Sequence, residues 1–364
     1  MVIQVRGTNG SGKSYLVRRV AGLMGPPMKL HWQDLPKFND KQKHFVLLTG
    51  GNCCGKSTIF NLLCKTFPMK GHFNFVSADN DPHWKADVNE LRRRIKKWLS
   101  TDSSTYLMEG TRITQAVFQT LGEMKDKTIK VTVVVIEQPL WLAKLRITKR
   151  RDRAGRALDK GLLTNENQLK YNACGVRQVN ALAKYGKLYE HDVHVIESKP
   201  NFINHPEIIG AVLKGLGCKT AIEAYELKRL FVLGDYGNEC GGCDKTFKTQ
   251  DHLCEVIAKY AVRGKHVLME QLIASHLYGR YAELYHRLKD KMIFAFLDTP
   301  VELCAERTKR RRRLRGNNKP FDNKNLLSHY KSSFTCKKKF DENGVKTMIL
   351  HYTEADKQLM GMLR

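Results

Sequence analysis

Short apolar runs alternate along the chain with amphipathic stretches, as expected for strands connected by helices. Two of these runs, Val2–Val5 and Phe45–Leu48, lead directly into glycine-rich segments, and helical patterns follow from Tyr15 and from Thr58. Strands that alternate with helices predict βαβ units and parallel sheets. The sequence therefore predicts an α/β fold with parallel sheets.

Both glycine-rich segments match the pattern G-x-x-x-x-G-K-[ST] of a phosphate-binding loop. The first loop contains Gly7, Thr8, Asn9, Gly10, Ser11, Gly12, Lys13 and Ser14, and the second contains Gly50, Gly51, Asn52, Cys53, Cys54, Gly55, Lys56 and Ser57, followed by Thr58. Glycines let backbone N–H groups surround the phosphates, the lysine reaches the β- and γ-phosphates, and the serine hydroxyl binds Mg²⁺. We therefore expect ATP and Mg²⁺ as cofactors, with Ser14 and Ser57 as magnesium ligands.

The two loops lie too close together in the sequence to belong to consecutive domains. Lys13 and Lys56 are 43 residues apart, whereas a compact αβα domain needs more than ~100 residues. The remaining strands of the first domain must therefore come later in the chain.

Two later stretches share one pattern. Each has an apolar strand that ends in Leu-Met-Glu, at Glu109 and at Glu270, and then a second apolar strand that ends in acid-x-Pro, at Pro139 and at Pro300. After the prolines the same offsets recur, so that Leu142, Arg146 and Arg150 match Leu303, Arg307 and Arg311. This agreement indicates an internal duplication.

A nested arrangement accommodates both copies. It predicts two P-loop αβα kinase-like domains: an outer one formed by residues 1–38 and 218–364, and an inner one formed by residues 39–217. The inner domain is inserted after the first helix of the outer one, and exposed loops are where whole domains are tolerated as insertions.

Acidic residues near the ends of the predicted strands are candidates for catalysis. Small kinases of this fold need a carboxylate that orients the acceptor hydroxyl, and Mg²⁺ beside the phosphates. Asp79 or Asp81 in the inner copy, and Asp235 or Asp244 in the outer copy, are the candidate bases. The strand-end glutamates Glu109 and Glu270 are candidates for holding Mg²⁺ through water or for orienting the acceptor. Helix or turn capping is the alternative role for each aspartate.

Basic helices follow the acid-x-Pro strands in both copies. Arginine suits a spreading phosphoryl charge because its donors are planar and bidentate. Arg150 and Arg311 are therefore candidate lid residues over the transferring phosphate. The outer helix carries five consecutive basic residues, Lys309–Arg313, which favours a second role in binding nucleic acid. A solvated basic face is the alternative.

The overall charge points to a polyanionic partner. Lys and Arg total 63 against 36 Asp and Glu, which leaves a net charge of +27 in 364 residues. Nucleic acid, with DNA first, is the partner that such a balance suits best. A basic surface typical of the host's proteins is the alternative.

The ten cysteines form no disulfide framework, which predicts a reducing, cytoplasmic setting, in the host cell if the protein is encoded by a phage. No apolar run reaches the ~18 residues of a membrane span, and the first residues read as a strand rather than as a secretory signal. Cys240 and Cys243 form a lone C-x-x-C pair, which is weak support for zinc. Glycines that shape an acceptor loop are the preferred interpretation of this segment.

These motifs resemble known families. Both copies resemble P-loop kinases of the nucleoside/nucleotide and polynucleotide kinase group, and the segment from Asp298 through Arg307 and Arg311 to Tyr330 is similar to the lid segment of bacteriophage polynucleotide kinases. The outer copy also resembles small bacteriophage P-loop proteins with an IQVRGTNGSGKS-type loop, a CGGCD segment and a VLMEG-like strand. Here Gln271 stands in place of that final glycine. Kinases of this broad type are implicated in phage thymine hypermodification, where 5-hydroxymethyluracil in DNA is phosphorylated.

The residues predict an ATP-dependent kinase acting on a hydroxyl of nucleic acid, and the resemblance implies the hydroxymethyl group of 5-hydroxymethyluracil in phage DNA. Three alternatives stay open: a polynucleotide 5′-hydroxyl kinase, a nucleoside or nucleotide kinase, and an ATP-regulated DNA-binding module without transfer chemistry. The sequence leaves open which copy is catalytic and which form of DNA is bound.

Overall fold

The chain folds into two compact units. The computed structural model describes residues 1–34, 36–38, 42–67, 73–80, 87–101, 105–149, 160–199, 205–237, 242–272, 278–288, 291–314, 316–317 and 319–363. Met1–Gln33 and Ala221–Arg364 form one unit, called the outer unit here, and Asp34–Thr220 forms the other, called the inserted unit. The borders fall five residues before and three residues after those drawn from the sequence.

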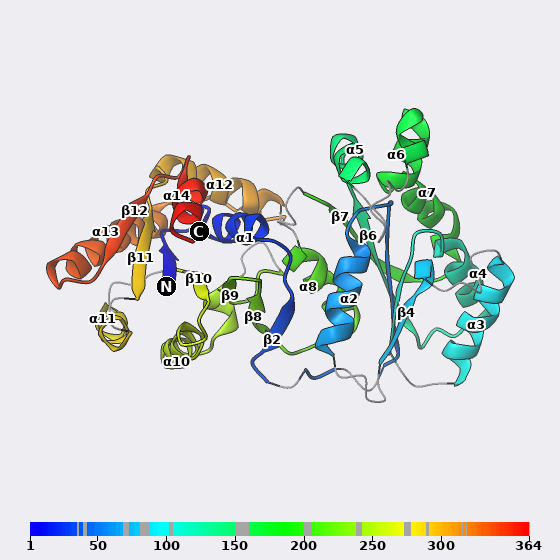
Figure 1. The fold of residues 1–364 in the computed structure, drawn as a ribbon, viewed down its shortest axis with the longest axis horizontal. Helices are drawn as coiled ribbons and strands as arrows, with labels where there is room; N and C mark the ends of the chain where they lie inside the picture. The colour runs from blue at the N-terminus through cyan, green and yellow to red at the C-terminus, as the bar shows by residue number, and fades with distance from the viewer. Residues whose placement is uncertain are drawn as a thin grey trace. The chain divides into compact units, whose positions relative to one another are not determined.

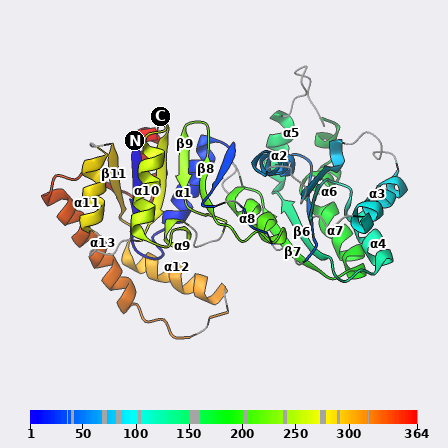
Figure 2. The same cartoon turned by 90° about the horizontal axis from the view of Figure 1, so that it is seen from below.

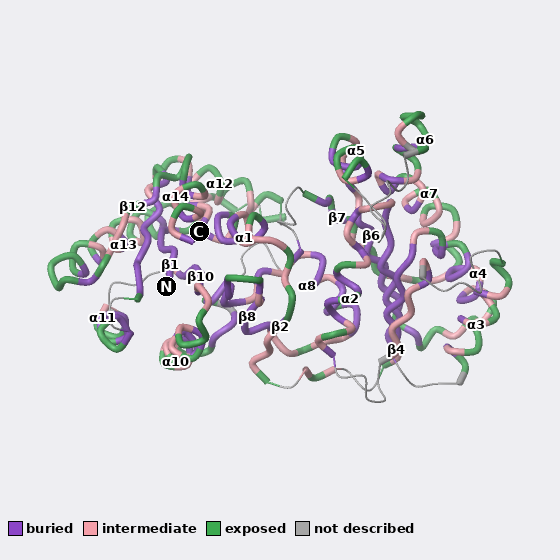
Figure 3. The backbone as a smooth tube through the Cα atoms, viewed as in Figure 1, coloured by how far each residue is buried: buried purple, intermediate pink, exposed green. Residues whose placement is uncertain are grey.

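The inserted unit is built on a five-stranded parallel sheet with the order β4-β5-β3-β6-β7. Its strands are β3 (His44–Gly50), β4 (Phe73–Ser77), β5 (Thr105–Glu109), β6 (Lys130–Glu137) and β7 (His191–Glu197). Every residue of the central strand β3 is buried, and Figure 3 shows buried backbone in purple in the middle of this unit, near β6. A strand covered on both faces needs the continuous apolar run that Phe45–Leu48 provides.

Helices cover both faces of this sheet. They are α2 (Lys56–Thr66), α3 (Val88–Thr101), α4 (Thr114–Met124), α5 (Leu140–Lys149), α6 (Glu166–Ala173), α7 (Val176–Tyr185) and α8 (His205–Gly215), with short 3₁₀ turns η1 (Ala78–Asn80), η2 (Lys160–Thr164) and η3 (Gly186–Leu188). Apolar residues of α3, α4 and α7 pack on one face of the sheet, and α2 and α8 pack on the other (Figures 1 and 2).

The outer unit has a seven-stranded sheet with the order β12-β11-β1-β10-β9-β8-β2. Its strands are β1 (Val2–Arg6), β2 (Lys29–Trp32), β8 (Ile222–Glu226), β9 (Leu230–Leu233), β10 (His266–Gln271), β11 (Met292–Leu297) and β12 (Thr347–Leu350). Five strands are parallel, but β8 runs antiparallel to β9, and β2 antiparallel to β8. The turn in which Leu227 N donates to Leu230 O joins β8 to β9 as a hairpin, which forces the antiparallel direction. The expectation of parallel sheets did not include this edge pair.

The helices of the outer unit pack around the same parallel core. They are α1 (Lys13–Met24), α9 (Cys243–Thr246), α10 (Gln250–Ala261), α11 (Tyr278–Arg287), α12 (Val301–Leu314), α13 (Lys324–Glu342) and α14 (Ala355–Leu363). Apolar residues of α10, α11 and α13 share one core cluster with β1, β10 and β11. Among the described residues, no helix has the length and apolar character needed to cross a bilayer.

The two units share one topology. Each unit has five parallel strands, which are numbered here from the strand before the phosphate loop, with the edge strands β8 and β2 left out. Their order in the sheet is second-third-first-fourth-fifth: β4-β5-β3-β6-β7 in one unit and β9-β10-β1-β11-β12 in the other. In both units, the strand-end glutamate pairs with the residue that lies two positions before the first loop glycine: Glu109 pairs with Leu48, and Glu270 pairs with Val5. The parallel register therefore brings glutamate and loop together at the carboxyl edge, where ligands bind in such sheets.

Candidate active site

The outer phosphate loop, Gly7–Ser14, connects β1 to α1. Gly10 has a φ of +79°, and a Cβ there would lie 2.3 Å from the carbonyl oxygen of Cys304, so only glycine fits this turn. The Lys13 ammonium donates to the carbonyl oxygens of Gly7 (2.9 Å) and Thr8 (3.0 Å). Lys13 therefore lies over its own loop and is nearly buried.

At the end of this loop a hydroxyl meets a carboxylate. Ser14 Oγ donates to Glu270 Oε1 at 2.7 Å. Glu270 is 3% exposed, and its burial raises the pKa of the carboxyl group, an effect that the nearby Lys13 opposes. A hydroxyl and a carboxylate oxygen held together are hard oxygen ligands of the kind Mg²⁺ prefers. The donor set at Ser14 and Glu270 thus fits a magnesium ion.

The inserted unit repeats this arrangement at its own loop. Ser57 Oγ lies 3.4 Å and 3.3 Å from the two carboxylate oxygens of Glu109. Ser77 Oγ donates to Glu109 Oε1 at 2.5 Å. Burial raises the pKa of Glu109, while the Ser77 hydrogen bond and Lys56 pull it back. The Ser57 and Glu109 oxygens fit Mg²⁺ for the same reason as those of Ser14 and Glu270.

The lysine of the inserted unit faces a second carboxylate. Lys56 Nζ lies 3.2 Å from Asp79 Oδ2. Thr111 holds that carboxylate from the next loop, because its backbone N–H donates to Oδ1 (3.0 Å) and its hydroxyl to Oδ2 (2.7 Å). Burial alone would raise the pKa of Asp79, but Lys56 and the two Thr111 hydrogen bonds outweigh it and lower the pKa. Asp79 is therefore a fixed, ionised group beside the phosphate loop.

An arginine from the helix after the fourth strand supports each loop. Arg307 Nη1 donates to Ser11 O at 3.3 Å, and Arg146 Nη1 contacts Cys54 O at 3.4 Å. Ser11 and Cys54 hold the same position in the two loops. Arg146 also donates to Ser198 Oγ at 2.8 Å. These two matched arginines bind the loops from outside, whereas Arg311 lies one turn beyond Arg307 on α12 and makes no hydrogen bond to the loop within the described chain.

The two candidate bases of the outer unit, Asp235 and Asp244, are placed differently from Asp79. Asp235 Oδ1 accepts from Gly237 N (2.8 Å) and from the Tyr225 hydroxyl (3.3 Å), which is the turn-capping role. Asp244 Oδ2 accepts from Leu272 N at 2.8 Å, just past β10. Within the described residues, neither aspartate forms an ion pair with Lys13.

The C-x-x-C segment packs against the outer glutamate. Gly242 has a φ of +103°, and a Cβ there would lie 2.2 Å from Glu270 Oε1. Cys243 is buried, and its thiol donates to Leu233 O at 3.4 Å. In the described part of the chain, no three His, Cys, Asp or Glu residues form a metal cluster.

Three predicted residues, Asp81, Arg150 and Cys240, lie outside the described residues. Sequence reasoning missed Thr111, Ser77 and the loop contacts of the two matched arginines. The equal offset of Arg146 and Arg307 after Pro139 and Pro300 was a signal for the arginines. No local pattern marks Thr111 as the partner of Asp79, 32 residues earlier.

Comparison with known proteins finds two curated relatives. One is a 5-hmdU DNA kinase of Pseudomonas phage PaMx11, 33% identical over 117 residues, which cover 32% of this chain and 61% of the relative. The other is a 5-hmdU DNA kinase of Pseudomonas phage M6, 27% identical over 140 residues, which cover 36% of this chain and 71% of the relative. The chain thus spans less than two thirds of the first relative. No protein-family model matches the chain.

Two solved structures show weak structural similarity to this chain. Polyphosphate kinase 2 from Arthrobacter aurescens TC1 has a TM-score of 0.35 and 14% identity over 57% of this chain and 76% of its own. A structure from the PezAT toxin–antitoxin system of Streptococcus pneumoniae has a TM-score of 0.26 and 16% identity over 45% and 71%. The assignment of the fold rests on the sheet topology instead.

Replacing Asp79 by Asn tests the ion pair. We expect Asp79→Asn to destabilise the inserted unit at neutral pH by on the order of 1–2 kcal/mol, because Lys56 loses its charged partner in a partly buried place. The folded pKa of Asp79 lies below its ordinary 3.8, so its stabilisation is present above that value and disappears as the pH falls through the lowered pKa. Thermal unfolding measured against pH checks this.

Asp192→Asn is the matched control, since Asp192 pairs with Lys130 at 3.6 Å on the exposed surface of the same unit and such pairs contribute little. Equal melting temperatures for the two variants at neutral pH would contradict the expectation.

Gly51→Ala tests the fit of the inserted unit's loop. A Cβ on Gly51 would lie 1.9 Å from the backbone oxygen of Ala173, so the loop or α6 must move. We expect a loss of about 1–3 kcal/mol in the free energy of unfolding and weaker binding of a non-hydrolysable ATP analogue. Gly161→Ala is the control, because a Cβ there meets nothing within 4 Å. Indistinguishable calorimetric and titration results for the two variants would show that the packing at Gly51 is irrelevant.

Proposed function

We propose that this chain is an ATP- and Mg²⁺-dependent kinase that phosphorylates a hydroxyl group on nucleic acid. The observation that carries the proposal is the grouping of Lys56, Asp79, Ser57 and Glu109 at the carboxyl edge of a parallel sheet, beside a phosphate loop. The proposed acceptor is the hydroxymethyl group of 5-hydroxymethyluracil in DNA. The two relatives that carry the name 5-hmdU DNA kinase support this acceptor.

The loop and its lysine act on the nucleotide. Backbone N–H groups of residues 50–57 and the dipole of α2 bind the phosphates, and Lys56 balances the charge of the transferring group. Ser57 and Glu109 hold Mg²⁺, which supplies further neutralisation of the phosphate oxygens. Arg146 fixes the loop carbonyls of Cys53 and Cys54, so that the N–H groups stay directed at the nucleotide.

Asp79 acts on the acceptor. Its lowered pKa keeps the carboxylate ionised at neutral pH, ready to accept a hydrogen bond from the acceptor hydroxyl. As the hydroxyl oxygen bonds to the γ-phosphorus, the bond from that phosphorus to the bridging oxygen of ADP breaks, and the hydroxyl proton passes to Asp79. Because phosphoryl transfer has a loose transition state, the proton leaves late, and positioning matters more than basicity.

The inserted unit is the proposed catalytic copy. Its lysine pairs with an acceptor-side carboxylate, whereas Lys13 of the outer unit donates to the carbonyls of its own loop. The outer unit, with Arg307–Arg313 on α12, then binds nucleotide or DNA in support. A polymer suits the net charge of +27 better than a free nucleoside, which needs only a few arginines. A base inside a duplex must be flipped out or presented on a single strand.

A labelling experiment with three acceptors tests the proposal. The chain is incubated with Mg²⁺, γ-phosphate-labelled ATP and one acceptor: DNA containing 5-hydroxymethyluracil, ordinary DNA with 5′-hydroxyl ends, or free nucleosides. We expect label within the hydroxymethylated DNA. Lys56→Ala should reduce the rate at least ~10²-fold, since it removes a transition-state charge partner, and Lys13→Ala should reduce it much less.

Lys125→Ala is the control, because it removes a lysine of the inserted unit far along the chain from the loop. Label found only on 5′ ends or only on nucleosides would contradict the proposed acceptor but support kinase activity. Loss of activity in Lys13→Ala alone would assign catalysis to the outer unit. Absence of label from every acceptor would reject the kinase and favour a binding module.

A further inference from the structure

A pocket of about 240 Å³ opens in the inserted unit next to the residue that holds Asp79. It lies where α4 begins and runs along α7, with one contribution from α6. It is lined by Thr111, Arg112, Thr114, Gln115, Tyr171, Arg177, Gln178, Asn180, Ala181, Lys184 and Tyr185. None of the proposed catalytic groups lines it, so it is a separate site.

The pocket carries positive charge without a counter-charge. Arg112, Arg177 and Lys184 line it, and no acidic residue does. In the described part of the chain these three cations form no ion pair. Arg177 lies 5.9 Å from the Tyr171 ring centre and Lys184 lies 5.3 Å from that of Tyr185, so aromatic faces hold two of the cations in place. Three unpaired cations around one hollow suit an anion.

Two residues that line the same pocket carry a buried polar atom without a partner in the described structure. Thr114 is 2% exposed and Gln178 is 1% exposed, and Thr114 Oγ1 and Gln178 Oε1 have no hydrogen-bond partner within the described structure. Such orphaned atoms cost free energy unless a ligand satisfies them. A threonine hydroxyl donates to a phosphate oxygen, and the glutamine oxygen accepts from a ligand O–H or N–H.

The start of α4 adds to the attraction. This helix has eleven residues, begins at Thr114, and has no side-chain hydrogen bond at its N-cap. Its first N–H groups and its dipole therefore favour a negative charge at Thr114 and Gln115. This helix end supports the site because Thr114 and Gln178, each with one buried polar atom that lacks a hydrogen-bond partner within the described structure, line the same pocket.

The pocket is connected to the transfer site through Thr111. Gln178 Nε2 donates to Thr111 O at 2.7 Å, and the other polar groups of Thr111 hold Asp79. A ligand that binds Gln178 and Thr114 would thus lie beside Thr111, the residue that holds the proposed acceptor-orienting carboxylate.

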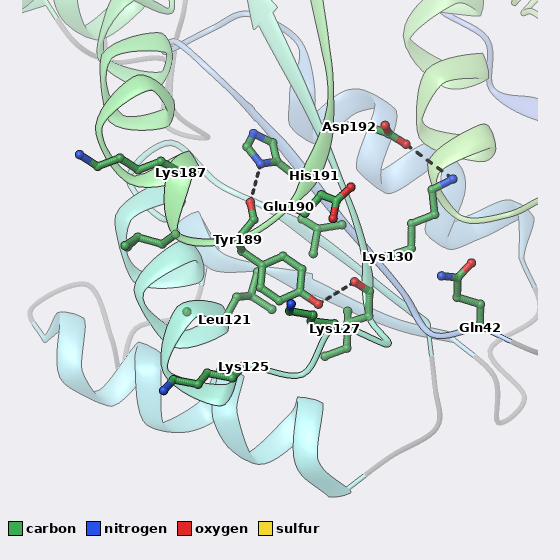
Figure 4. A pocket seen from close by; sticks show the side chains of 14 residues that line it. Gln42, Leu121, Lys125, Lys127, Lys130, Lys187, Tyr189, Glu190, His191 and Asp192 are labelled. Carbon is green, nitrogen blue, oxygen red and sulfur yellow. Dashed lines mark hydrogen bonds and ion pairs between the residues drawn. The ribbon is translucent and has the colours of Figure 1, made fainter.

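A second pocket in the inserted unit lacks this combination of unpaired cations and unpartnered buried atoms. Figure 4 shows a larger hollow, about 710 Å³, with Lys125, Lys127, Lys130 and Lys187 around it. Glu190 and Asp192 also line it, and Lys130 pairs with Asp192 at 3.6 Å. None of the buried unpartnered atoms of the described residues belongs to it. It lies at the amino ends of β6 and β7, away from the phosphate loop.

We propose that the smaller pocket binds a backbone phosphate of the nucleic-acid strand that carries the acceptor. Arg112, Arg177 and Lys184 balance the phosphate charge, the Thr114 hydroxyl and the first N–H groups of α4 donate to its oxygens, and Gln178 accepts from the attached nucleotide. This inference rests on the proposed function for the identity of the ligand. It goes beyond that function by assigning the site that selects a polymer.

Binding of a short fluorescein-labelled single-stranded DNA without hydroxymethylated bases tests the pocket. The full-length chain is compared with the triple variant Arg112→Gln, Arg177→Gln, Lys184→Gln and with the single variant Thr114→Val. The matched control is Lys125→Gln, Lys127→Gln, Lys187→Gln, which removes equal charge from the other pocket. Anisotropy titrations over a range of salt concentrations give the affinity and its salt slope.

We expect the triple variant to bind at least ~10-fold more weakly, with a salt slope reduced by about 0.7 for each phosphate charge that is no longer neutralised, and the control to bind with a smaller loss. Thr114→Val should weaken binding several-fold without lowering the melting temperature, because it removes an unpaired buried hydroxyl. Equal losses in the triple variant and the control, or unchanged binding by Thr114→Val, would overturn the proposal.

Competition identifies the source of the phosphate. In this experiment thymidine monophosphate competes with the labelled DNA, at a concentration comparable to that of the DNA. If it displaces the DNA from the intact chain but not from the triple variant, the assignment of the pocket to a strand phosphate is overturned and a free nucleotide is favoured. Because the readout is binding, a chain that fails the labelling experiment yet loses DNA affinity in the triple variant retains this site and loses only the kinase proposal.

Discussion

The hydrogen-bonded pairing of the loop serine with a buried strand-end glutamate is the constraint on which both units depend. Ser14 with Glu270, and Ser57 with Glu109, tie the start of a helix to the neighbouring strand. The pairing requires the parallel register of the strands, because a slip of one residue would turn the glutamate to the other face of the sheet. It also requires that the glutamate be buried, which raises its pKa in both units. Burying such an acid is costly, and the nearby lysine and serine hydroxyls reduce that cost.

The two units differ in what surrounds this shared frame. In the inserted unit the loop lysine has a fixed carboxylate partner in Asp79. The outer unit instead buries a cation, Arg6, directly before its loop, and no carboxylate among the described residues pairs with it. Its guanidinium lies 4.4 Å, 4.6 Å and 5.1 Å from the ring centres of Tyr281, Phe294 and Phe340, and burial lowers its pKa to about 10. The two units thus share one backbone topology but place different charged groups around the phosphate loop. This difference favours different roles for the two loops, although both loops match the same sequence pattern.

Features of the sequence that depend on short-range pattern were predicted well. The glycine-rich turns after β1 and β3, the strands before them and the repeated offset that matches Arg146 with Arg307 follow from local motifs, and the α/β fold is confirmed, with strands that are parallel except at the β9–β8–β2 edge. Features that depend on distant pairing were not predicted. The hydrogen bonding of Thr111 to Asp79 and the pairing of β8 with β2 at the edge of the outer sheet arise from packing between distant segments, which no single stretch of sequence encodes. The pocket at α4 and α7 is the extreme case, since Thr114 and Gln178 are ordinary polar residues until the fold buries them together.

The net charge and the pocket would contribute to different parts of the proposed nucleic-acid binding. A charge of +27 attracts any polyanion and raises encounter rates, but it is screened by salt and carries no positional information. Orientation requires groups that are fixed before the ligand arrives. The proposed pocket would meet this requirement, because Arg177 and Lys184 lie beside tyrosine rings and the side chains of Thr114 and Gln178 are buried. The same reasoning applies to the proposed transfer site, where Thr111 holds Asp79 by two hydrogen bonds. A single residue, Thr111, hydrogen-bonds both to Asp79, the proposed acceptor-orienting group, and to Gln178 of the proposed phosphate pocket, which would place strand binding next to acceptor alignment.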